Sequence, residues 1–171
     1  NGTYVIDALT SNVFTFREQV HAAYIQFRSF TGDKEKPSWK YDVGLRGEQV
    51  WNNGQAATNN VSFSNNYFNL FPTANISYYK TPDEFWKLSY SRRINRPGLG
   101  QLNPFVDITD SLNKHGGNPY LKPELVHSLE WGYNKEWSKL SVYTTLFYRN
   151  ATNTIRQFTV LFSNGVALTQ P

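Results

Sequence analysis

Residues 39–51 read WKYDVGLRGEQVW, a run in which apolar and polar side chains alternate. The apolar residues Trp39, Tyr41, Val43, Leu45 and Trp51 stand at odd positions, and Lys40, Asp42, Gly44, Arg46 and Glu48 stand at the alternate positions. Successive side chains of a β-strand point to opposite faces, so this run predicts a strand with one apolar and one polar face.

The same alternation recurs along the chain and predicts six strands, at residues 17–30, 38–51, 66–80, 85–94, 125–135 and 139–150. No segment of comparable length carries the apolar stripe of a helix. The fold class that follows is all-β, an antiparallel up-and-down meander.

The links between these strands alternate in length. Short turns are expected near Gly32, Pro82 and Glu136, whereas long loops are expected at Asn52–Asn66 and Asn95–Glu124. Alternate connections of a meander lie at opposite ends, so the long loops should share one end. This asymmetry and strands of about ten residues are typical of outer-membrane barrels.

The alternation also predicts which side chains face lipid. We expect the outward set to be Trp39, Tyr41, Val43, Leu45, Trp86, Leu88, Tyr90, Leu129, Trp131, Leu140, Val142 and Leu146. The inward set is Asp42, Arg46, Glu48, Ser89, Ser91 and Glu130. Tyr and Trp favour the headgroup depth of a membrane, and six are candidates for this interface: Trp39, Tyr41, Trp51, Trp86, Tyr133 and Trp137. The alternative that remains open is a soluble β-sandwich, a carbohydrate-binding module that stacks exposed aromatic rings on sugars.

Composition narrows the function classes. The 171 residues contain no cysteine, which excludes a disulfide framework and thiolate chemistry. A mean hydropathy of −0.56 without a long apolar run predicts no transmembrane helix. A net charge of +4 from only 18% charged residues is sparse for a nucleic-acid partner, and none is predicted.

No set of residues in the sequence suggests catalysis. His21, His115 and His127 are scattered outside any metal-binding frame. Asp107 and Asp110 offer a calcium-binding loop as the one alternative. We therefore predict no enzyme, no cofactor and no metal site.

Residues 92–124 read RRINRPGLGQLNPFVDITDSLNKHGGNPYLKPE and carry the most specific signal. Together with the other matching pieces, they resemble the C-terminal barrel part of TonB-dependent outer-membrane receptors, especially those of the Bacteroidetes type. The pieces are Tyr41–Glu48, Leu70–Tyr78, Leu88–Pro97, Leu102–Phe105, Gly117–Glu124 and Leu146–Arg149. In order and spacing they cover nearly the whole chain.

The resemblance implies a barrel of about 22 strands around an N-terminal plug, which imports a nutrient across the bacterial outer membrane with energy from TonB. Residues 1–171 are then expected to be a partial barrel domain without the plug and the remaining strands, forming an open, curved sheet. The implied partners are outer-membrane lipid, the plug domain and TonB, and a surface lipoprotein is left open.

The arginines of the matching segment are the candidate contacts. Arg92, Arg93 and Arg96 fall where a strand enters a long loop, so their guanidinium groups can bind plug carboxylates or an anionic substrate, with lipopolysaccharide phosphate or solvent as the alternative. A strand is expected to start after Pro123, which cannot donate to a ladder. Glu124 is then the first candidate to pair with one of these arginines.

Overall fold

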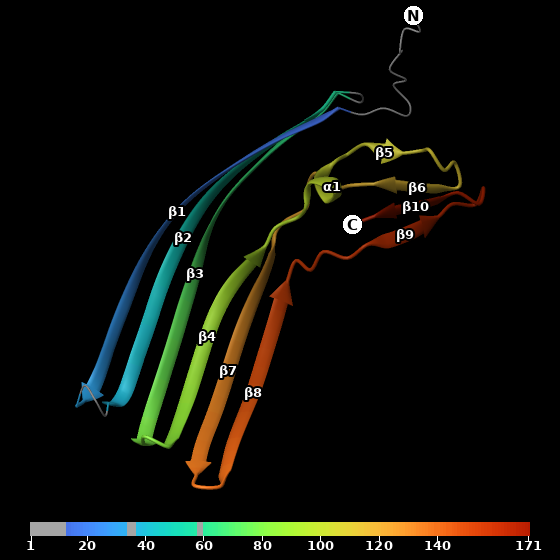
Figure 1. The fold of residues 1–171 in the computed structure, drawn as a ribbon. Helices are drawn as coiled ribbons and strands as arrows, with labels where there is room; N and C mark the ends of the chain where they lie inside the picture. Colours follow the sequence, from blue (N-terminus) through green and yellow to red (C-terminus); the bar gives the residue numbers. More distant parts are fainter. Residues whose placement is uncertain (1–12, 34–36, 58–59) are drawn as a thin grey trace, which may run out of the picture.

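The computed structural model describes residues 13–33, 37–57 and 60–171 as one long, curved sheet with a smaller sheet beyond its end (Figure 1). The large sheet has six antiparallel strands in the order β1-β2-β3-β4-β7-β8. These strands are β1 (Phe14–Gly32), β2 (Pro37–Ala56), β3 (Val61–Thr81), β4 (Glu84–Asn95), β7 (Glu124–Trp137) and β8 (Leu140–Thr152). The predicted all-β meander is confirmed, with each predicted strand present and extended by one to five residues at most of its ends.

The connections lie at the predicted ends of the sheet. The turns β1–β2, β3–β4 and β7–β8 share one end, which we call the turn end (Figure 1). The β2–β3 turn and residues 96–123, which we call the β4–β7 segment, lie at the opposite, loop end. Among the described residues β1 and β8 pair on one side only, so the sheet stays open. The expectation of an open, curved sheet is confirmed.

One predicted loop is a strand pair instead. The prediction that Asn52–Asn66 forms a long loop is wrong, because β2 and β3 continue their ladder through it to the pair Ala56–Val61. An aromatic cluster stabilises this Asn-rich extension: the rings of Phe14, Phe16 and Phe63 lie 6.2–6.4 Å apart. The Phe63 ring lies directly over Gly54, where no Cβ would fit.

The β4–β7 segment is also more ordered than its sequence predicts. It contains the one-turn helix α1 (Leu99–Leu102) within the stretch that the sequence predicts to be a long loop. It then forms β5 (Val106–Asp107) and β6 (Asn113–Gly116), which join β9 (Phe158–Leu161) and β10 (Ala167–Gln170) in the small sheet, order β5-β6-β10-β9. These pieces are too short for an alternating pattern to reveal them.

From β2 to β7 each face of the large sheet keeps one predominant character. One row of directly opposed residues runs through Tyr41, Ile76, Leu88, Trp131 and Leu146. The neighbouring row on the other face runs through Asp42, Asn75, Ser89, Glu130 and Phe147. All twelve side chains predicted to face outward share the first face, and all six predicted to face inward share the second. We call these the outer and the inner face.

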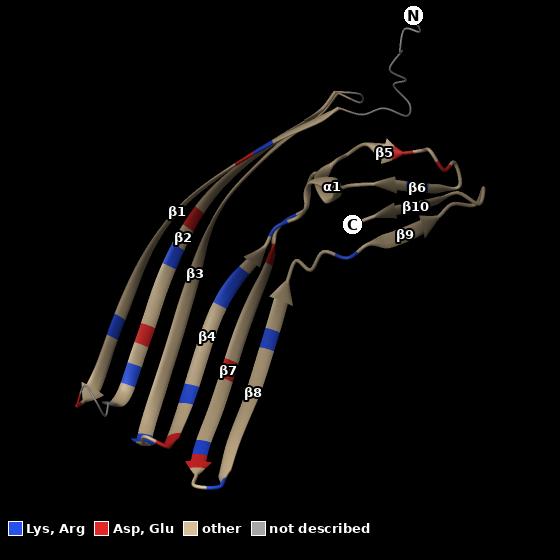
Figure 2. Cartoon of the chain, in the orientation of Figure 1, with Lys and Arg blue, Asp and Glu red and all other residues tan. Residues whose placement is uncertain are grey.

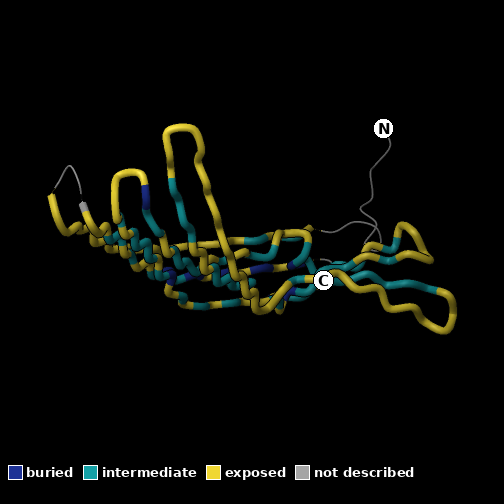
Figure 3. Tube along the Cα trace, turned by 90° about the horizontal axis from the view of Figure 1, so that it is seen from below, coloured by how far each residue is buried: buried dark blue, intermediate teal, exposed yellow. Residues whose placement is uncertain are grey.

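The sheet is a single layer with little buried core. Most of the chain is exposed or half-buried (Figure 3). The buried apolar residues are Val50, Ala56, Phe63, Phe71 and Leu102, and the four on strands all belong to the inner face of β2 and β3. Charged side chains are sparse on the strands and gather at the turn end and at the loop end of β4 (Figure 2). No helix in the described part of the chain is long and apolar enough to cross a membrane.

Candidate functional site: an arginine-lined split in the sheet

β3 and β4 separate halfway along the sheet. β3 pairs with β4 only between Thr73 and Thr81, although its ladder with β2 continues to Val61. Pro72 accounts for the first missing pair, and β4 itself ends at Asn95, which the register would place opposite Asn69. The backbone groups of even-numbered residues in this part of β3 face β4, and Pro72 has no N–H to donate there. We call the opening above the Thr73–Ser91 pair the β3–β4 split.

Arg92 bridges the first open position of the split. Its Nη1 donates a 3.1 Å hydrogen bond to the backbone oxygen of Leu70 on β3. Strict alternation would place Arg92 on the outer face with Tyr90, but the side chain reaches the unpaired β3 edge instead. Its Nε is buried without a partner among the described residues. Arg92 thus replaces part of the ladder that Pro72 interrupts.

Arg96 ties the start of the β4–β7 segment to the inner face of β2. Its Nη2 donates to Oε2 of Glu48 at 2.5 Å, and Nη2 of Arg46 lies 2.8 Å from the other carboxylate oxygen. The Glu48 side chain is only 6% exposed. A carboxylate this buried is tolerated where it is paired and hydrogen-bonded, so the two arginines stabilise it in place.

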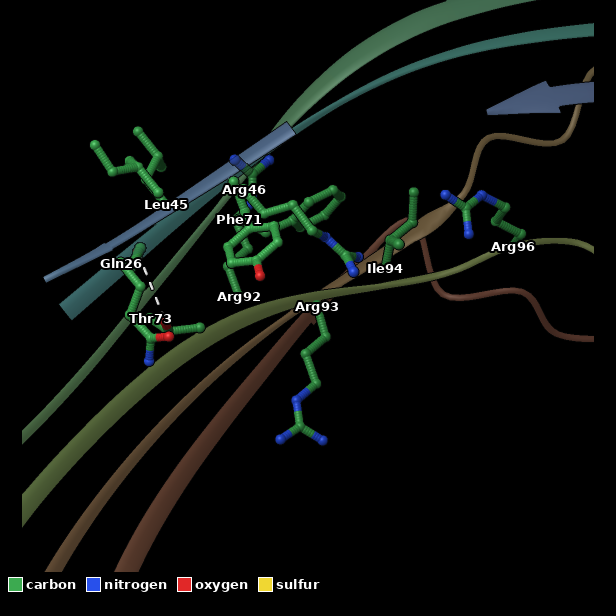
Figure 4. A pocket seen from close by; sticks show the side chains of 12 residues that line it. Gln26, Leu45, Arg46, Phe71, Thr73, Arg92, Arg93, Ile94 and Arg96 are labelled. Atoms are coloured by element: carbon green, nitrogen blue, oxygen red, sulfur yellow. Dashed lines mark hydrogen bonds between the residues drawn. The ribbon is translucent and has the colours of Figure 1, made fainter. Parts of the chain in front are cut away.

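A cavity of about 510 Å³ opens beside these contacts, lined by Arg46, Arg92, Arg93 and Arg96 together with Tyr24, Ile25, Gln26, Gly44, Leu45, Phe71, Thr73 and Ile94 (Figure 4). No acidic side chain lines it. Figure 4 shows Arg93 pointing away from the other arginines, and Arg93 forms no ion pair within the described part of the chain. A cluster of guanidinium groups of this kind can hold a carboxylate or a phosphate through forked hydrogen bonds.

Glu124 does not belong to this cluster. Its Oε2 accepts a 3.2 Å hydrogen bond from Nδ2 of Asn95, its direct partner in the β4–β7 register. The prediction that Glu124 pairs with an arginine is therefore wrong, because the register places Asn95 within reach first. β7 does begin at Glu124, immediately after Pro123, as predicted.

Three of the six predicted interface aromatics, Trp39, Trp86 and Tyr133, lie in one row near the turn end of the outer face. The row runs through Trp39, Tyr78, Trp86 and Tyr133 with centroid distances of 4.6, 5.6 and 5.3 Å, and Tyr41 stacks on Trp39 at 6.0 Å. Trp137 lies at the tip of β7, beside Nζ of Lys135 at 5.8 Å. Trp51 lies toward the loop end, edge-on to His21 at 5.1 Å. Their depth in a membrane stays a prediction.

His127 and the two aspartates considered for catalysis or metal binding form hydrogen bonds within the fold. Tyr90 Oη and His127 Nδ1 share a 2.9 Å hydrogen bond on the outer face. No group of three or more metal-ligating side chains gathers in the residues that the structure describes. Asp107 accepts from Thr109, and Asp110 accepts from the backbone N–H groups of Leu112 and Asn113. These bonds lower the pKa of both carboxyls, mainly through the Thr109 and Asn113 side chains.

The sequence analysis did not identify the roles of two residues at this site, Glu48 and Pro72. Glu48 was assigned correctly to the inner face, but nothing in the sequence points to Arg96 as its partner. Pro72 carried a usable signal, because a proline inside an alternating strand marks an edge or a break in the ladder.

Comparisons with known proteins agree with this architecture. A sequence model of the outer membrane protein beta-barrel family matches residues 1–171. The solved ferric enterobactin receptor PfeA of Pseudomonas aeruginosa, a mutant in complex with enterobactin, is 14% identical with a TM-score of 0.51 over 92% of this chain and 31% of its own. The siderophore receptor PirA of the same bacterium is 13% identical, with a TM-score of 0.52 over 93% of this chain and 37% of its own. No curated protein matches the sequence.

The chain spans about a third of the length of these solved receptors. At this level of identity the likeness shows a shared fold, and it confirms the resemblance to the barrel part of TonB-dependent receptors. The bacterial outer membrane is the location that the family and the receptor fold support. The match over all 171 residues, the single-layer meander and its two distinct faces lead to one conclusion: the chain belongs to the outer membrane protein beta-barrel family.

Proposed function

We propose that this chain forms part of the wall of a receptor that imports a nutrient across the outer membrane with energy from TonB. The observation that carries the proposal is the division of the sheet into an apolar outer face and a polar inner face with an arginine-lined cavity. An apolar band around a polar lumen is the construction of outer-membrane barrels. The unpaired edges of β1 and β8 support a larger barrel, since open edges do not persist in hydrocarbon.

Exposed aromatic rings on the inner face support a filled lumen. Tyr24, Tyr143 and Phe147 are 79%, 73% and 78% exposed, and all three lie on the face that carries Asp42 and Glu130. Rings of this size gain free energy when another surface covers them. A plug domain inside the barrel would supply that cover, and Arg93 would then be free to bind a plug carboxylate or an anionic substrate.

The competing interpretation, a soluble β-sandwich that binds sugars, is contradicted. A sandwich needs a second sheet packed across the first. The small sheet lies beyond the loop end of the large one instead of across its face (Figure 1). The family is one of outer-membrane barrels rather than of enzymes. A surface lipoprotein partner stays a prediction from the resemblance.

The proposal is tested with the full-length protein in its own bacterium. Cells that lack this gene should lose uptake of one scarce nutrient, and plasmid-borne wild type should restore it. Restoration should fail in cells without a working TonB system, as expected for energised transport. Uptake that persists without TonB would identify a passive pore and contradict the proposal.

A further inference from the structure

The loop half of β3 presents an unpaired backbone edge. Above Pro72, β3 pairs with β2 alone. The carbonyl of Leu70 points to the open side, where Arg92 meets it. Backbone groups alternate in direction along a strand, so those of Phe68, Asn66 and Ser64 point to the same side. They have no partner there among the described residues, and they recur every two residues at about 7 Å intervals.

A second cavity, of about 550 Å³, runs along this edge. One wall is β3 from Ser64 to Asn69, and the other comprises Pro97, Leu102, Leu125 and residues 120–123 of the β4–β7 segment. A hydrogen bond of 3.0 Å from Asn65 Nδ2 to the Pro119 backbone oxygen joins the two walls. The segment therefore stands beside the strand edge without pairing with it.

The lining of this cavity is nearly uncharged. Its only ionisable side chains are Lys122 and the phenols Tyr67 and Tyr120, and the remaining polar lining comes from Ser64 and from the amides Asn52, Asn65, Asn66, Asn69 and Asn153. The Tyr67 hydroxyl is buried beside the Arg96 guanidinium and the Asn52 amide, although neither meets it with full hydrogen-bond geometry.

We propose that this cavity binds a short, uncharged peptide in extended conformation, which pairs with the Ser64–Phe68 edge as an added strand. The inference deepens the proposed function by naming the substrate class of the receptor. An extended peptide offers donors and acceptors at the same two-residue interval as the β3 edge, as in other cases of strand addition. The cavity volume lies within the range of small-ligand sites.

The lining residues agree with this occupant. The apolar side chains of Leu102 and Leu125 and the amides of Asn65, Asn66 and Asn69 all line the cavity, so an added strand would meet both apolar and amide groups. A saccharide would use the amides and rings but would leave the regular row of backbone groups unpaired. The peptide matches the two-residue interval of these backbone groups and the saccharide does not, which favours the peptide.

The test uses the full-length receptor in detergent and measures binding by titration calorimetry. The probes are a blocked tetrapeptide Val-Thr-Val-Thr, the same peptide methylated on every amide nitrogen, and maltotetraose. We expect the methylated peptide to bind about tenfold more weakly than its parent, because it cannot complete the ladder. Equal binding of the two peptides, or binding of maltotetraose instead, would overturn the inference.

Two variants locate the site. Asn66→Pro removes an N–H from the open edge but none from the β2–β3 ladder, so peptide binding should be lost while the barrel still forms. Asn66→Ala keeps the backbone N–H and loses only one side-chain contact, so it should retain clearly more binding than Asn66→Pro. Equal losses in both variants would assign binding to the amide side chain and overturn strand addition.

The two proposals can fail separately. TonB-dependent uptake of a nutrient by a receptor that binds no peptide would refute the inference and leave the transport function intact. Peptide binding by a protein whose uptake does not need TonB would refute the proposed transport function and leave the peptide-binding inference intact.

Discussion

Arg96 and Glu48 lie 48 positions apart in the sequence and form an ion pair of 2.5 Å at the inner face of β2. The pair fixes the point at which the β4–β7 segment leaves the sheet. Arg96 also lines the first cavity, so the pair helps to shape that cavity.

Breaking this pair should loosen the β4–β7 segment. Arg96→Ala leaves the nearly buried Glu48 with Arg46 alone, at a cost of about 1–2 kcal/mol in unfolding free energy. Limited proteolysis of the intact receptor should then cut residues 99–112 faster than in wild type. Arg93→Ala is the matched control, because Arg93 forms no ion pair among the described residues. Equal protection of the segment in both variants would show that the pair does not anchor it.

A charge on the outer face should be far more costly than one on the inner face. Leu88→Arg places a guanidinium among Ile76 and Trp131 and should destabilise the folded barrel by about 2–4 kcal/mol. Ser89→Arg, one residue on, faces the lumen and should cost less than about 1 kcal/mol. Denaturant titration of the reconstituted protein measures both, and a reversed order would invert the face assignment.

The aromatic row at the turn end should stabilise the barrel as a unit. Trp86→Ala removes two ring contacts, to Tyr78 and to Tyr133, and should lower the unfolding free energy by about 1–3 kcal/mol. Trp137→Ala, outside the row, should lower it by less than about 1 kcal/mol. Equal effects in the same denaturant titration would mean that the ring contacts add nothing to simple burial.

Acid should loosen the loop that Asp107 and Asp110 hold. Hydrogen bonds from Thr109 and Asn113 lower the pKa of both carboxyls below the usual value of 3.8. Because the pKa is lowered in the folded state, the ionised carboxylates stabilise the loop fully at a pH above 3.8. This stabilisation is lost as the pH falls below that value. Amide exchange of Leu112 and Asn113, corrected for intrinsic rates, should therefore accelerate in acid. Asp110→Asn should flatten this pH dependence, and an unchanged profile would exclude Asp110 as its source.

Features that depend on neighbouring residues could be predicted from the sequence, whereas contacts between residues far apart in the sequence could not. Alternation is local, so it located six strands and separated Leu88 from Ser89 correctly. The β2–β3 extension was missed because asparagine disfavours strands on average, whereas here the rings over Gly54 outweigh that preference. Side-chain partners from different strands could not be predicted from the sequence. Asn95 binds Glu124 because of the β4–β7 register, and Arg96 binds Glu48 because of the path of the β4–β7 segment.

The central claim is that the two faces of this sheet meet different solvents, and single cysteines test it most directly because the 171 residues contain none. Spin labels at Ile76, Leu88 and Trp131 of the full-length receptor in lipid should be relaxed by oxygen, which concentrates in hydrocarbon. Labels at Asn75, Ser89 and Glu130 should be less affected by oxygen than the outer set. If the labels of the second set were the more oxygen-accessible, the barrel-wall account would be contradicted.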